Sequence, residues 1–569
     1  MCGIFCVFNT FCNNCDNLIN QLTFEANIRN RGPDSFNFKV LTWKDTSLAF
    51  ASSVLWLQGN KITVQPIEDS DSIFCYNGDI FAGFDVSEQK LSGDTQLIHQ
   101  FIKKHISRNS LSNLDKVQGP YAFIYFDKTS NKLYFGRDIF GRRSLLLGQN
   151  KERDTFIITS VAKRQSQFDF IEIPSVGIFC YDIENGKFEV DFWQYKNHHF
   201  YGKLKELEKF LSTDVSIINQ PVESECETHC FSENANLKAL LGIEDMVKSK
   251  DYNGESTAIF DTLLNCDTWM EQVKCLKRLL EKAISQRISA QPDFCKNCIK
   301  SKSFCTHSTT GILFSGGVDC AVLAALTDQY VDKNKPIDLL NVSFDEGNHY
   351  ESPDRLTGLQ TFEELKSQYP GRKWNFVPVN VTKASLNEDR ERHIADLIYP
   401  LNTIMDDSLG CALWYASRGV AESYTSPCRI LIVGMGADEL FGGYSRHRTS
   451  FKRYSWKGLQ EVLDEDWMNL PYRNLGRDDR VVSDHGRQLR TPYLDERVVE
   501  FVRGLKCWEK TYPSENLPQG VGEKILLRSL AYHLGLKGAA VLKKRALQFG
   551  SRIANGKENA HEVSPRLAF

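Results

Sequence analysis

The cysteine at position 2 has the most specific chemistry in this chain, which opens Met1-Cys2-Gly3-Ile4-Phe5. Removal of Met1 would leave Cys2 with both a thiol and a free α-amino group. The thiolate is the nucleophilic form of cysteine, and an α-amino group with a pKa of about 7.7–8.0 can take up its proton near neutral pH. The alternative is a structural cysteine that opens a buried strand, because apolar residues follow at Ile4, Phe5, Val7 and Phe8. Taken alone, position 2 favours the structural interpretation.

A glycine-rich segment in the second half predicts a phosphate-binding loop. Ser315-Gly316-Gly317-Val318-Asp319 follows the apolar run 311–314 and precedes a stretch of helical character, 320–326. Adjacent glycines allow backbone N–H groups to converge on a phosphate at a helix N-terminus, and Ser315 adds a hydroxyl donor. Asp319 would repel a bare phosphate, so we expect it to hold Mg²⁺ that bridges to the phosphate. An ordinary strand-to-helix turn is the alternative, because the loop lacks a Walker A ending.

The elements that must position these residues fall into two units joined by a looser segment. Residues 1–195 contain many short β-like runs with helical stretches between them, which predicts an α+β domain. Residues 196–270 show no persistent period and predict a linker, partly ordered at most. From 271 to 569, strand-like runs alternate with helical stretches, which predicts an α/β domain with a doubly wound parallel sheet. The polar tail from about 555 is expected to fray.

Composition excludes several classes of protein. The 569 residues are enough for two or three domains, and 41% hydrophobic with 25% charged residues is typical of a globular protein. The net charge is -3 and there is no long basic tract, so we expect no nucleic-acid partner. No run approaches the roughly 18 apolar residues of a membrane span, and no secretory signal pattern is present, so we expect a cytoplasmic protein without a membrane partner. The 17 cysteines should then be mostly reduced.

Ordered motifs in both halves resemble those of one family. The first half carries, in order, Met1-Cys2-Gly3-Ile4, Arg31-Gly32-Pro33-Asp34, Asn77-Gly78-Asp79, Ser92-Gly93-Asp94 and Gly136-Arg137-Asp138-Ile139-Phe140-Gly141, as class II glutamine amidotransferases do. The second half adds the 315–319 loop, the segment 434–444, the later landmarks 490–495 and 522–524, and the lysine-containing segment 543–552. The chain is thus similar to glutamine-dependent asparagine synthetases, and in particular to the asparagine synthetase domain-containing proteins. This resemblance implies an N-terminal nucleophile (Ntn) hydrolase-type αββα sandwich at 1–195 and a PP-loop ATP pyrophosphatase domain at 271–569.

The resemblance implies a first reaction, hydrolysis of glutamine. Cys2 would attack the side-chain carbonyl of glutamine, and its own amine would pass the proton to the departing ammonia. The side-chain amide of Asn77 and the backbone N–H of Gly78 would stabilise the oxyanion. The glutamine-binding residues implied are Arg31, Asp79 and Asp94, with Asp94 at the substrate ammonium group. Asn77-Gly78 is also typical of a type I′ hairpin turn, and the two interpretations are compatible.

The second reaction implied is adenylation of aspartate by ATP, followed by attack of ammonia to give asparagine, AMP and pyrophosphate. An internal tunnel would carry the ammonia between the sites. The ATP-binding residues implied are Phe314, Ser315, Gly316, Gly317, Asp319, Phe344, Val433, Gly434 and Lys544, with Mg²⁺ at Asp319 and Asp438. For Phe314 and Phe344 a plain core role is an equal alternative. The expected partners are therefore the small molecules glutamine, aspartate and ATP, whereas the oligomeric state is not fixed by the sequence.

Two residues depart from the family pattern. Val54 stands where the glutaminases place an arginine that grips the α-carboxylate of glutamine, and a valine cannot donate a hydrogen bond. Met435 stands where asparagine synthetases have a glutamate proposed to handle protons. Two alternatives to asparagine synthesis therefore stay open. One is a scaffold that binds nucleotide or a partner protein, and the other is an amide ligase for a different carboxylate.

A group of four candidate metal ligands precedes the phosphate loop. Cys295, Cys298, Cys305 and His307 would suit a structural tetrahedral zinc site with three thiolates and one imidazole. Their spacing is short and irregular, which favours a loop of reduced thiols over zinc.

Overall fold

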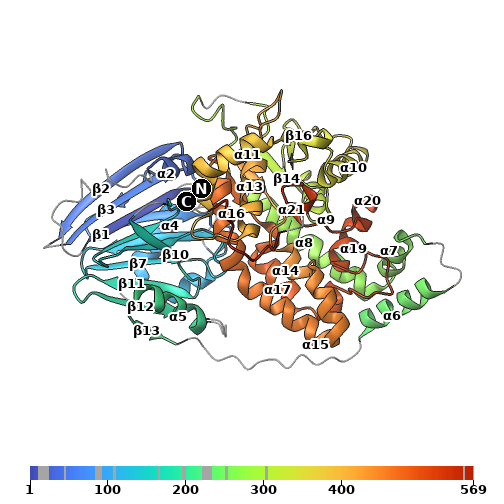
Figure 1. Ribbon diagram of the computed structural model, residues 1–569, viewed down its shortest axis with the longest axis horizontal. Coiled ribbons are helices and arrows are strands. Elements are labelled where there is room, and N and C mark those ends of the chain that lie inside the picture. Colours follow the sequence, from blue (N-terminus) through green and yellow to red (C-terminus); the bar gives the residue numbers. More distant parts are fainter. Residues whose placement is uncertain are drawn as a thin grey trace.

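The computed structural model describes residues 1–9, 25–43, 46–83, 93–106, 111–164, 167–194, 200–220, 234–249, 254–301, 305–554 and 558–567. Its N-terminal part is a block of β-strands that lies against a largely helical C-terminal part (Figure 1). Within the described residues, no helix is both long and apolar enough to cross a membrane. The site residues are carried by three β-sheets, two in the first part and one in the second.

The first sheet places the beginning of the chain at its centre. Its strand order is β10-β8-β9-β1-β3-β2, with β1 (Gly3–Asn9) antiparallel to both neighbours. The other strands are β2 (Ser35–Trp43), β3 (Thr46–Val54), β8 (Leu146–Asn150), β9 (Thr155–Thr159) and β10 (Phe168–Glu172). Alternate residues of β1 enter two different buried clusters, Ile4 and Cys6 on one face and Phe5 and Val7 on the other. The apolar run after Cys2 therefore forms a strand that is buried on both faces.

The second sheet faces the first across an aromatic core. Its order is β13-β12-β11-β7-β6-β5-β4, and its strands are β4 (Ile67–Glu68), β5 (Ser72–Gly78), β6 (Tyr121–Asp127), β7 (Lys132–Arg137), β11 (Gly177–Asp182), β12 (Lys187–Phe192) and β13 (Val215–Asn219). Phe50 of the first sheet meets Phe126 of the second with ring centroids 6.2 Å apart. Helix α2 (Glu25–Arg31) packs on the first sheet and α4 (Asp94–Ile106) on the second. The αββα sandwich expected from the resemblance is confirmed.

The third sheet is entirely parallel, as the alternation of strands and helices predicts. Its order is β16-β15-β14-β17-β18, with β14 (Thr310–Leu313), β15 (Ile337–Ser343), β16 (Trp374–Asn380), β17 (Ile430–Ile432) and β18 (Gln488–Arg490). The order runs outward in both directions from β14, so the chain changes direction between β14 and β17. Ligands of doubly wound sheets bind outside the carboxyl ends of the strands at such a point. The phosphate loop follows β14 at that end.

Helices surround this sheet and build most of the second part of the chain (Figure 1). Helices α9 (Val318–Thr327), α10 (Pro353–Gln368), α13 (Ile404–Arg418) and α16 (Gly476–Ser483) contact the sheet, and α8 (Asp267–Ser289) and α19 (Ile525–His533) pack on α9. Further helices of this part are α11 (Lys383–Asp389), α12 (Ala395–Ile398), α14 (Ala437–Phe441), α15 (Ser445–Leu470), α17 (Glu496–Gly504), α18 (Cys507–Lys510), α20 (Lys537–Val541) and α21 (Leu547–Gly550).

The segment expected to be a linker, 196–270, contains regular elements wherever it is described. Helix α5 (Phe200–Leu211) and strand β13 belong to the N-terminal part, and β13 pairs in parallel with β12. Helices α6 (Ala235–Lys248) and α7 (Thr257–Leu264) bury apolar residues in the core of the second part, and α8 already begins at Asp267. The sequence pattern missed these elements because each is short, and their stability comes from packing against distant segments.

The C-terminal tail, expected to fray from about 555, is held in place over its described residues 558–567. The backbone N–H groups of Ile404 and Met405 donate to the carbonyls of Glu562 and Ala560, at 2.9 and 3.0 Å. The first N–H groups of a helix have no partner inside the helix, so the tail satisfies donors at the start of α13. Such a role depends on tertiary contact and leaves no pattern in the tail itself.

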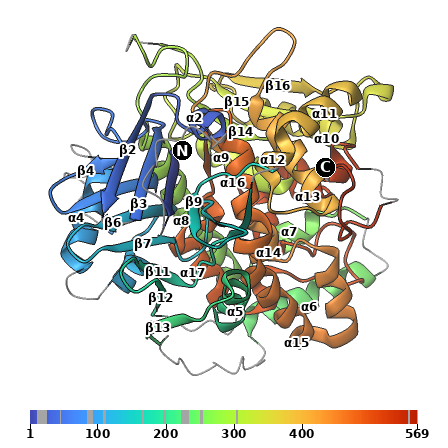
Figure 2. The same cartoon turned by 60° about the vertical axis from the view of Figure 1, so that its left-hand side comes forward.

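Buried ion pairs join the two parts of the chain. Asp479 of α16 pairs with Arg31 at 2.6 Å and with Arg143 at 3.3 Å, and all three side chains are almost fully buried. Figures 1 and 2 both show the beginning of the chain close to α16. Removing one partner from a buried pair typically costs about 3–5 kcal/mol. The relative position of the two parts is therefore strongly specified.

Candidate active sites at the domain interface

Cys2 lies between the two sheets of the sandwich, immediately before β1. Its backbone N–H donates to the side-chain oxygen of Asn77 on β5 at 3.0 Å. The Asn77 side-chain nitrogen, Nδ2, is buried and has no hydrogen-bond partner among the described residues. A buried donor left unpaired costs about 1–3 kcal/mol, which makes it rare in a folded protein. The structure thus places an available N–H donor beside the thiol-bearing residue.

A cavity extends from Cys2 and brings together most of the predicted glutaminase residues. Its lining includes Met1, Cys2, Val54, Gln58, Gln65, Tyr76, Gly78, Asp79, Asp94 and Gln488. At Gly78 an added Cβ would lie 2.7 Å from the backbone oxygen of Pro120, so a larger residue cannot occupy this wall without a shift of the chain. Asn77, the residue before it, faces Cys2 as described above. Cys2, Asn77, Gly78, Asp79 and Asp94 are therefore neighbours in space.

Met1 fills part of this site. Its side chain is 1% exposed and its sulfur contacts Arg143 Nη1 at 2.6 Å. Burial lowers the pKa of its α-amino group to about 4. Loss of Met1 would therefore open space beside the thiol. It would also convert the Cys2 nitrogen, already 3.0 Å from Asn77 Oδ1, into a free amine.

The environment of the Cys2 thiol favours the neutral form before substrate binds. Burial raises the pKa of the thiol, while the nearby terminal amine and a hydrogen bond from the Leu55 backbone lower it in part. Gln65 Nε2 lies 3.8 Å from the Cys2 sulfur, and Gln65 Oε1 accepts a hydrogen bond from Tyr76 N at 2.7 Å. Sequence reasoning missed this contact of Gln65, because nothing near residue 65 indicates a partner at residue 2.

Asp94 is suited to bind a cation in the cavity. Burial, followed by the charge of Asp79, raises the pKa of the Asp94 carboxyl to about 8. The carboxylate accepts a hydrogen bond from Thr95 N at 2.8 Å. An ammonium group would favour the ionised form, so binding of such a group and ionisation of Asp94 are coupled.

This coupling predicts a pH dependence of glutamine use. Because the pKa of Asp94 lies above its ordinary value, the carboxylate is mostly protonated below pH 8. We expect kcat/KM for glutamine to rise about tenfold per pH unit up to roughly pH 7 and to level off above pH 8. Asp94→Asn should lower kcat/KM and remove this rise. Asp191→Asn, a buried aspartate outside the cavity, is the control and should keep the wild-type profile; a rise that survives Asp94→Asn would contradict the assignment.

Asp79 is held by arginines from both parts of the chain. Its carboxylate pairs with Arg143 at 3.1 Å and with Arg490 of β18 at 3.3 Å, and it accepts a hydrogen bond from Gln58 Nε2 at 2.9 Å. Burial lowers the pKa of Arg490 to about 10. The second domain therefore completes the wall of the cavity. Sequence reasoning assigned no role to these arginines or to Gln58 and Gln488, although the motif at 490–495 marked the position of Arg490.

Neither Arg31 nor Val54 brings an arginine side chain into the cavity to grip glutamine. Arg31 is not among the described residues that line the cavity. Its Nε donates to the backbone oxygen of Cys2 at 3.3 Å and its Nη2 pairs with Asp479. The geometry thus gives Arg31 a positioning role behind Cys2, without the contact that the glutamine-binding prediction requires. Val54 is 5% exposed and forms part of the cavity wall, so the position of the missing arginine does face the site.

The phosphate loop has the backbone that its glycines predict. Gly316 has φ +83°, and an added Cβ would lie 2.5 Å from the backbone carbon of Thr357. Gly317 is the N-cap of α9, and its N–H lies 3.4 Å from Ser315 Oγ. A glycine turn and the N-terminus of α9 therefore lie at the carboxyl end of β14. Such an arrangement binds anions.

Alanine is expected to be harmful at one of the two glycines of the loop and tolerated at the other. At position 316 the left-handed φ and the clash with Thr357 should destabilise the domain by about 1–3 kcal/mol and weaken ATP binding. At position 317, φ is -67° and the nearest atom to an added Cβ is the flexible Ser315 Oγ at 3.5 Å. We therefore expect Gly317→Ala to leave the melting midpoint almost unchanged. Thermal unfolding compares the two variants, and equal midpoints would contradict the steric argument.

Two acidic residues predicted to hold a metal meet around a buried lysine. Lys524 Nζ lies 2.6 Å from Asp319 and 2.7 Å from Asp438, and Lys544 Nζ lies 3.2 Å from the other oxygen of Asp438. Burial would lower the pKa of Lys524, but the two carboxylates raise it above its ordinary value. Burial raises the pKa of the Asp438 carboxyl, but Lys524 and Lys544 lower it more. The pKa therefore lies below its ordinary value. Sequence reasoning noted position 524 as a landmark and missed this role.

The remaining predicted ATP residues lie at the carboxyl ends of the parallel strands. Phe314 follows β14, Phe344 follows β15, and Val433 and Gly434 follow β17. Phe314 and Val433 are each 2% exposed and belong to core clusters, which fits the core alternative for the Phe314 side chain. Phe344 is less buried and packs edge-on against Tyr415. An added Cβ at Gly434 would lie 3.0 Å from Asp319 Cβ, so this glycine allows the two segments to approach.

One short segment touches both sites. Gln488 lines the cavity of Cys2, and Arg490 pairs with Asp79 there. The Arg490 carbonyl accepts a hydrogen bond from Val433 N at 3.0 Å, and Tyr493 Oη donates to the Asp319 carbonyl at 2.9 Å. Residues 488–493 therefore form a direct structural connection between the cavity and the phosphate loop.

Comparison with known proteins agrees with this arrangement. The family model for the glutamine amidotransferase domain matches residues 1–169, and the model for asparagine synthase matches residues 305–470. An asparagine synthetase domain-containing protein of Drosophila melanogaster is 35% identical over the whole of both chains. The chain belongs to the asparagine synthetase domain-containing proteins. Asparagine synthetase domain-containing protein 1 of Bos taurus is 33% identical over all of this chain and 98% of its own length. A glutamine-hydrolysing asparagine synthetase of Gallus gallus is 23% identical over 98% of this chain and 86% of its own.

Membership in this family establishes the general type of the protein. The protein is asparagine synthetase-like and carries a glutamine amidotransferase domain, and the asparagine synthase family uses ATP. The curated relatives with 33–35% identity are named for the domain they contain, and the relative named as a synthetase is more distant.

Proposed function

We propose that the protein hydrolyses glutamine at Cys2 and uses the ammonia to form an amide on an ATP-activated carboxylate. The proposed acceptor is aspartate, and the products are glutamate, asparagine, AMP and pyrophosphate. The observation that carries the proposal is the cavity lined by Cys2, Gly78 and Asp94, with the unpaired Asn77 amide beside Cys2. Each of these residues has the chemistry that glutamine hydrolysis needs, and no pairing within the described residues uses the Asn77 donor.

In the first reaction the Cys2 sulfur attacks the amide carbon of glutamine. The free amine of Cys2, formed by loss of Met1, takes the thiol proton and transfers it to the leaving ammonia. Asn77 Nδ2 and the Gly78 N–H would stabilise the oxyanion, and loss of one such donor costs about 2.7–4 kcal/mol. Water then cleaves the thioester and releases glutamate. Asp94 would bind the ammonium group of the substrate throughout.

In the second reaction the 315–319 loop would bind ATP phosphates, with Lys524 and Lys544 facing their negative charge. Asp319 and Asp438 would hold Mg²⁺, which neutralises and orients the pyrophosphate when bound. The residues fit such an ion, because both carboxylates already converge on one cation, the Lys524 ammonium. Ammonia would pass between the sites within the protein, along the side of the 488–493 segment.

Two further functions remain as candidates because specific residues favour them. Val54 lies in the cavity wall and offers no hydrogen-bond donor to the α-carboxylate of glutamine. Met435 packs against two core clusters, and its side chain cannot transfer a proton. Both observations favour a scaffold that binds nucleotide or a partner protein. They also fit an amide ligase whose acceptor is a different carboxylate.

One assay separates these functions. Purified protein is incubated with ATP, Mg²⁺ and aspartate, with either glutamine or ammonium as the nitrogen source. We expect AMP and pyrophosphate to form only when aspartate is present. Bound nucleotide with no turnover from either nitrogen source would favour the scaffold, and turnover with another carboxylate would favour the ligase. Intact mass of the same sample must show loss of Met1, because a retained Met1 leaves Cys2 without a free amine.

A further inference from the structure

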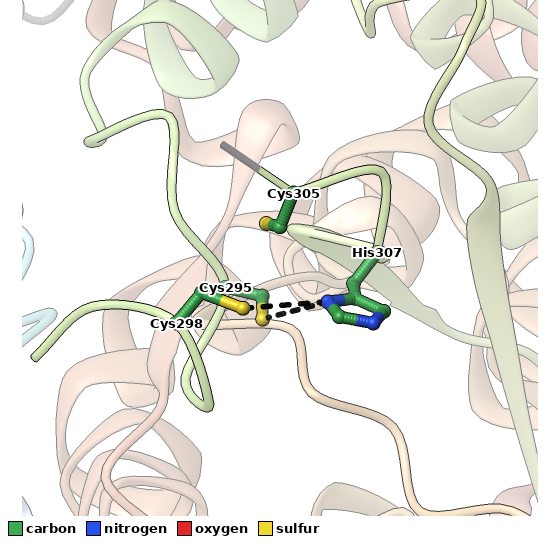
Figure 3. Close-up of side chains that lie close together, drawn as sticks. All are labelled: Cys295, Cys298, Cys305 and His307. Atoms are coloured by element: carbon green, nitrogen blue, oxygen red, sulfur yellow. Dashed lines mark hydrogen bonds between the residues drawn. The ribbon is translucent and has the colours of Figure 1, made fainter. Parts of the chain in front are cut away.

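The structure gathers four potential metal ligands on the connection between α8 and β14. Cys295 and Cys298 lie on a turn after α8, and Cys305 and His307 lie shortly before β14. Figure 3 shows the thiols of Cys295 and Cys298 beside the imidazole of His307, with the Cys305 thiol close to them. We propose that these four residues bind a structural Zn²⁺ ion.

The distances fit tetrahedral zinc. Both Cys295 Sγ and Cys298 Sγ lie 3.5 Å from His307 Nδ1, and the four ligand atoms lie within 4.8 Å of one another. With Zn–S bonds of about 2.3 Å and a Zn–N bond of about 2.0–2.1 Å, a regular tetrahedron has sulfur–nitrogen edges of about 3.6 Å. Its sulfur–sulfur edges are about 3.8 Å. Coordination therefore needs only a small contraction of the loop, and His307 would bind through Nδ1.

The chemistry of the cluster also selects zinc. The three cysteines are free thiols, with Cys295 and Cys305 buried and Cys298 half-buried. His307 is exposed, so an ion can reach the cluster from solvent. Three thiolates and a neutral imidazole form one of the usual closed ligand sets of structural zinc. With Zn²⁺ they carry one net negative charge, and Lys296 and Lys300 on the same turn carry positive charge nearby.

The position of the cluster gives the ion a structural task. The described residues between the end of α8 and the start of β14 form no helix or strand, so a metal would add a cross-link between the two ends of this connection. Lys296 N donates to the Pro427 carbonyl at 2.8 Å, shortly before β17, and Lys296 Nζ donates to the His485 carbonyl at 2.9 Å. His307 is followed after two residues by β14, which leads into the phosphate loop. Zinc would thus fix the loop against the segments that build both sites.

Metal analysis of the full chain tests the proposal. Protein purified without chelators should contain about one zinc per chain, and cobalt(II) added to metal-free protein should give the absorption of a tetrahedral thiolate site. Cys298→Ser and His307→Ala change exposed or half-buried ligands, so both should fold yet lose most of the zinc. Cys275→Ser, a half-buried cysteine of α8 outside the cluster, should keep it.

Removal of the metal gives a second readout that does not depend on catalysis. We expect metal-free protein to melt at a lower temperature and to recover its midpoint when zinc is returned, whereas Cys298→Ser should not respond to zinc. The proposal would be overturned if wild-type protein contained no zinc, or contained iron in its place. Retention of the zinc by both Cys298→Ser and His307→Ala would overturn it too. A Cys295–Cys298 disulfide in protein that was purified under reducing conditions would overturn it as well.

Discussion

We expect Cys2→Ala to abolish glutamine-dependent ammonia release, by about three orders of magnitude or more, because the nucleophile of the reaction is lost. Ammonium-dependent formation of AMP should survive in the same variant, since the phosphate loop and its lysines do not involve Cys2. The cavity should also keep its affinity for glutamine, because Asp94 and Asn77 remain. Ammonia release and AMP formation are measured separately, with glutamine or ammonium as the nitrogen source.

Controls make this expectation specific. Cys266→Ala changes a half-buried cysteine remote from the cavity and should behave as the wild type. Asn77→Ala removes the unpaired donor and should reduce the rate by a factor of about 10²–10³ without affecting the use of ammonium. Glutamine hydrolysis by Cys2→Ala at a rate near that of the wild type would show that another residue is the nucleophile.

Lys524→Met is expected to have the largest effect in the second domain. The substitution leaves the half-buried carboxylates of Asp319 and Asp438 close together without their shared, fully buried cation. Loss of one partner from a buried ionic cluster typically costs about 3–5 kcal/mol, so the melting midpoint of this domain should fall by about 10 °C. ATP turnover should be lost as well, because the loop would then present two carboxylates to the phosphates. Thermal unfolding and pyrophosphate release measure the two effects.

Lys544→Met is the matched control, because it removes the same charge from a more accessible position. Lys544 is 23% exposed and lies 4.5 Å from the Tyr444 ring centroid, whereas Lys524 is 1% exposed. The Lys544–Asp438 pair is partly exposed and therefore weakened by solvent, so stability should change less than in Lys524→Met while pyrophosphate release slows. Equal stability of the two variants would contradict the role of Lys524 as the central cation.

The residues predicted from sequence are those whose partners lie in the same short motif. Gly316 needs a left-handed φ, Asp94 begins a helix, and Asn77 precedes a glycine, and each of these is a local property. Arg490 and Lys524 could be located by their motifs, but their roles depend on Asp79 in the other domain and on Asp438 many residues away. Their importance follows from tertiary contacts that no local pattern specifies.

The fold shows the same division. The parallel sheet follows from strands that alternate with helices, and β1 follows from a continuous apolar run. Helices α6 and α7 were hidden because a short amphipathic helix gains its stability from the core it covers. The tail at 558–567 was hidden because its carbonyls satisfy donors of α13, about 150 residues earlier in the chain.

Transfer of nitrogen from glutamine to the acceptor tests the central claim most directly. Wild-type protein without Met1 is given amide-¹⁵N glutamine, ATP, Mg²⁺ and aspartate in the presence of excess unlabelled ammonium. We expect asparagine, AMP and pyrophosphate in equal amounts, with ¹⁵N in the asparagine amide beyond the share that free exchange with the ammonium pool allows. Absence of AMP and pyrophosphate with both nitrogen sources would contradict the account.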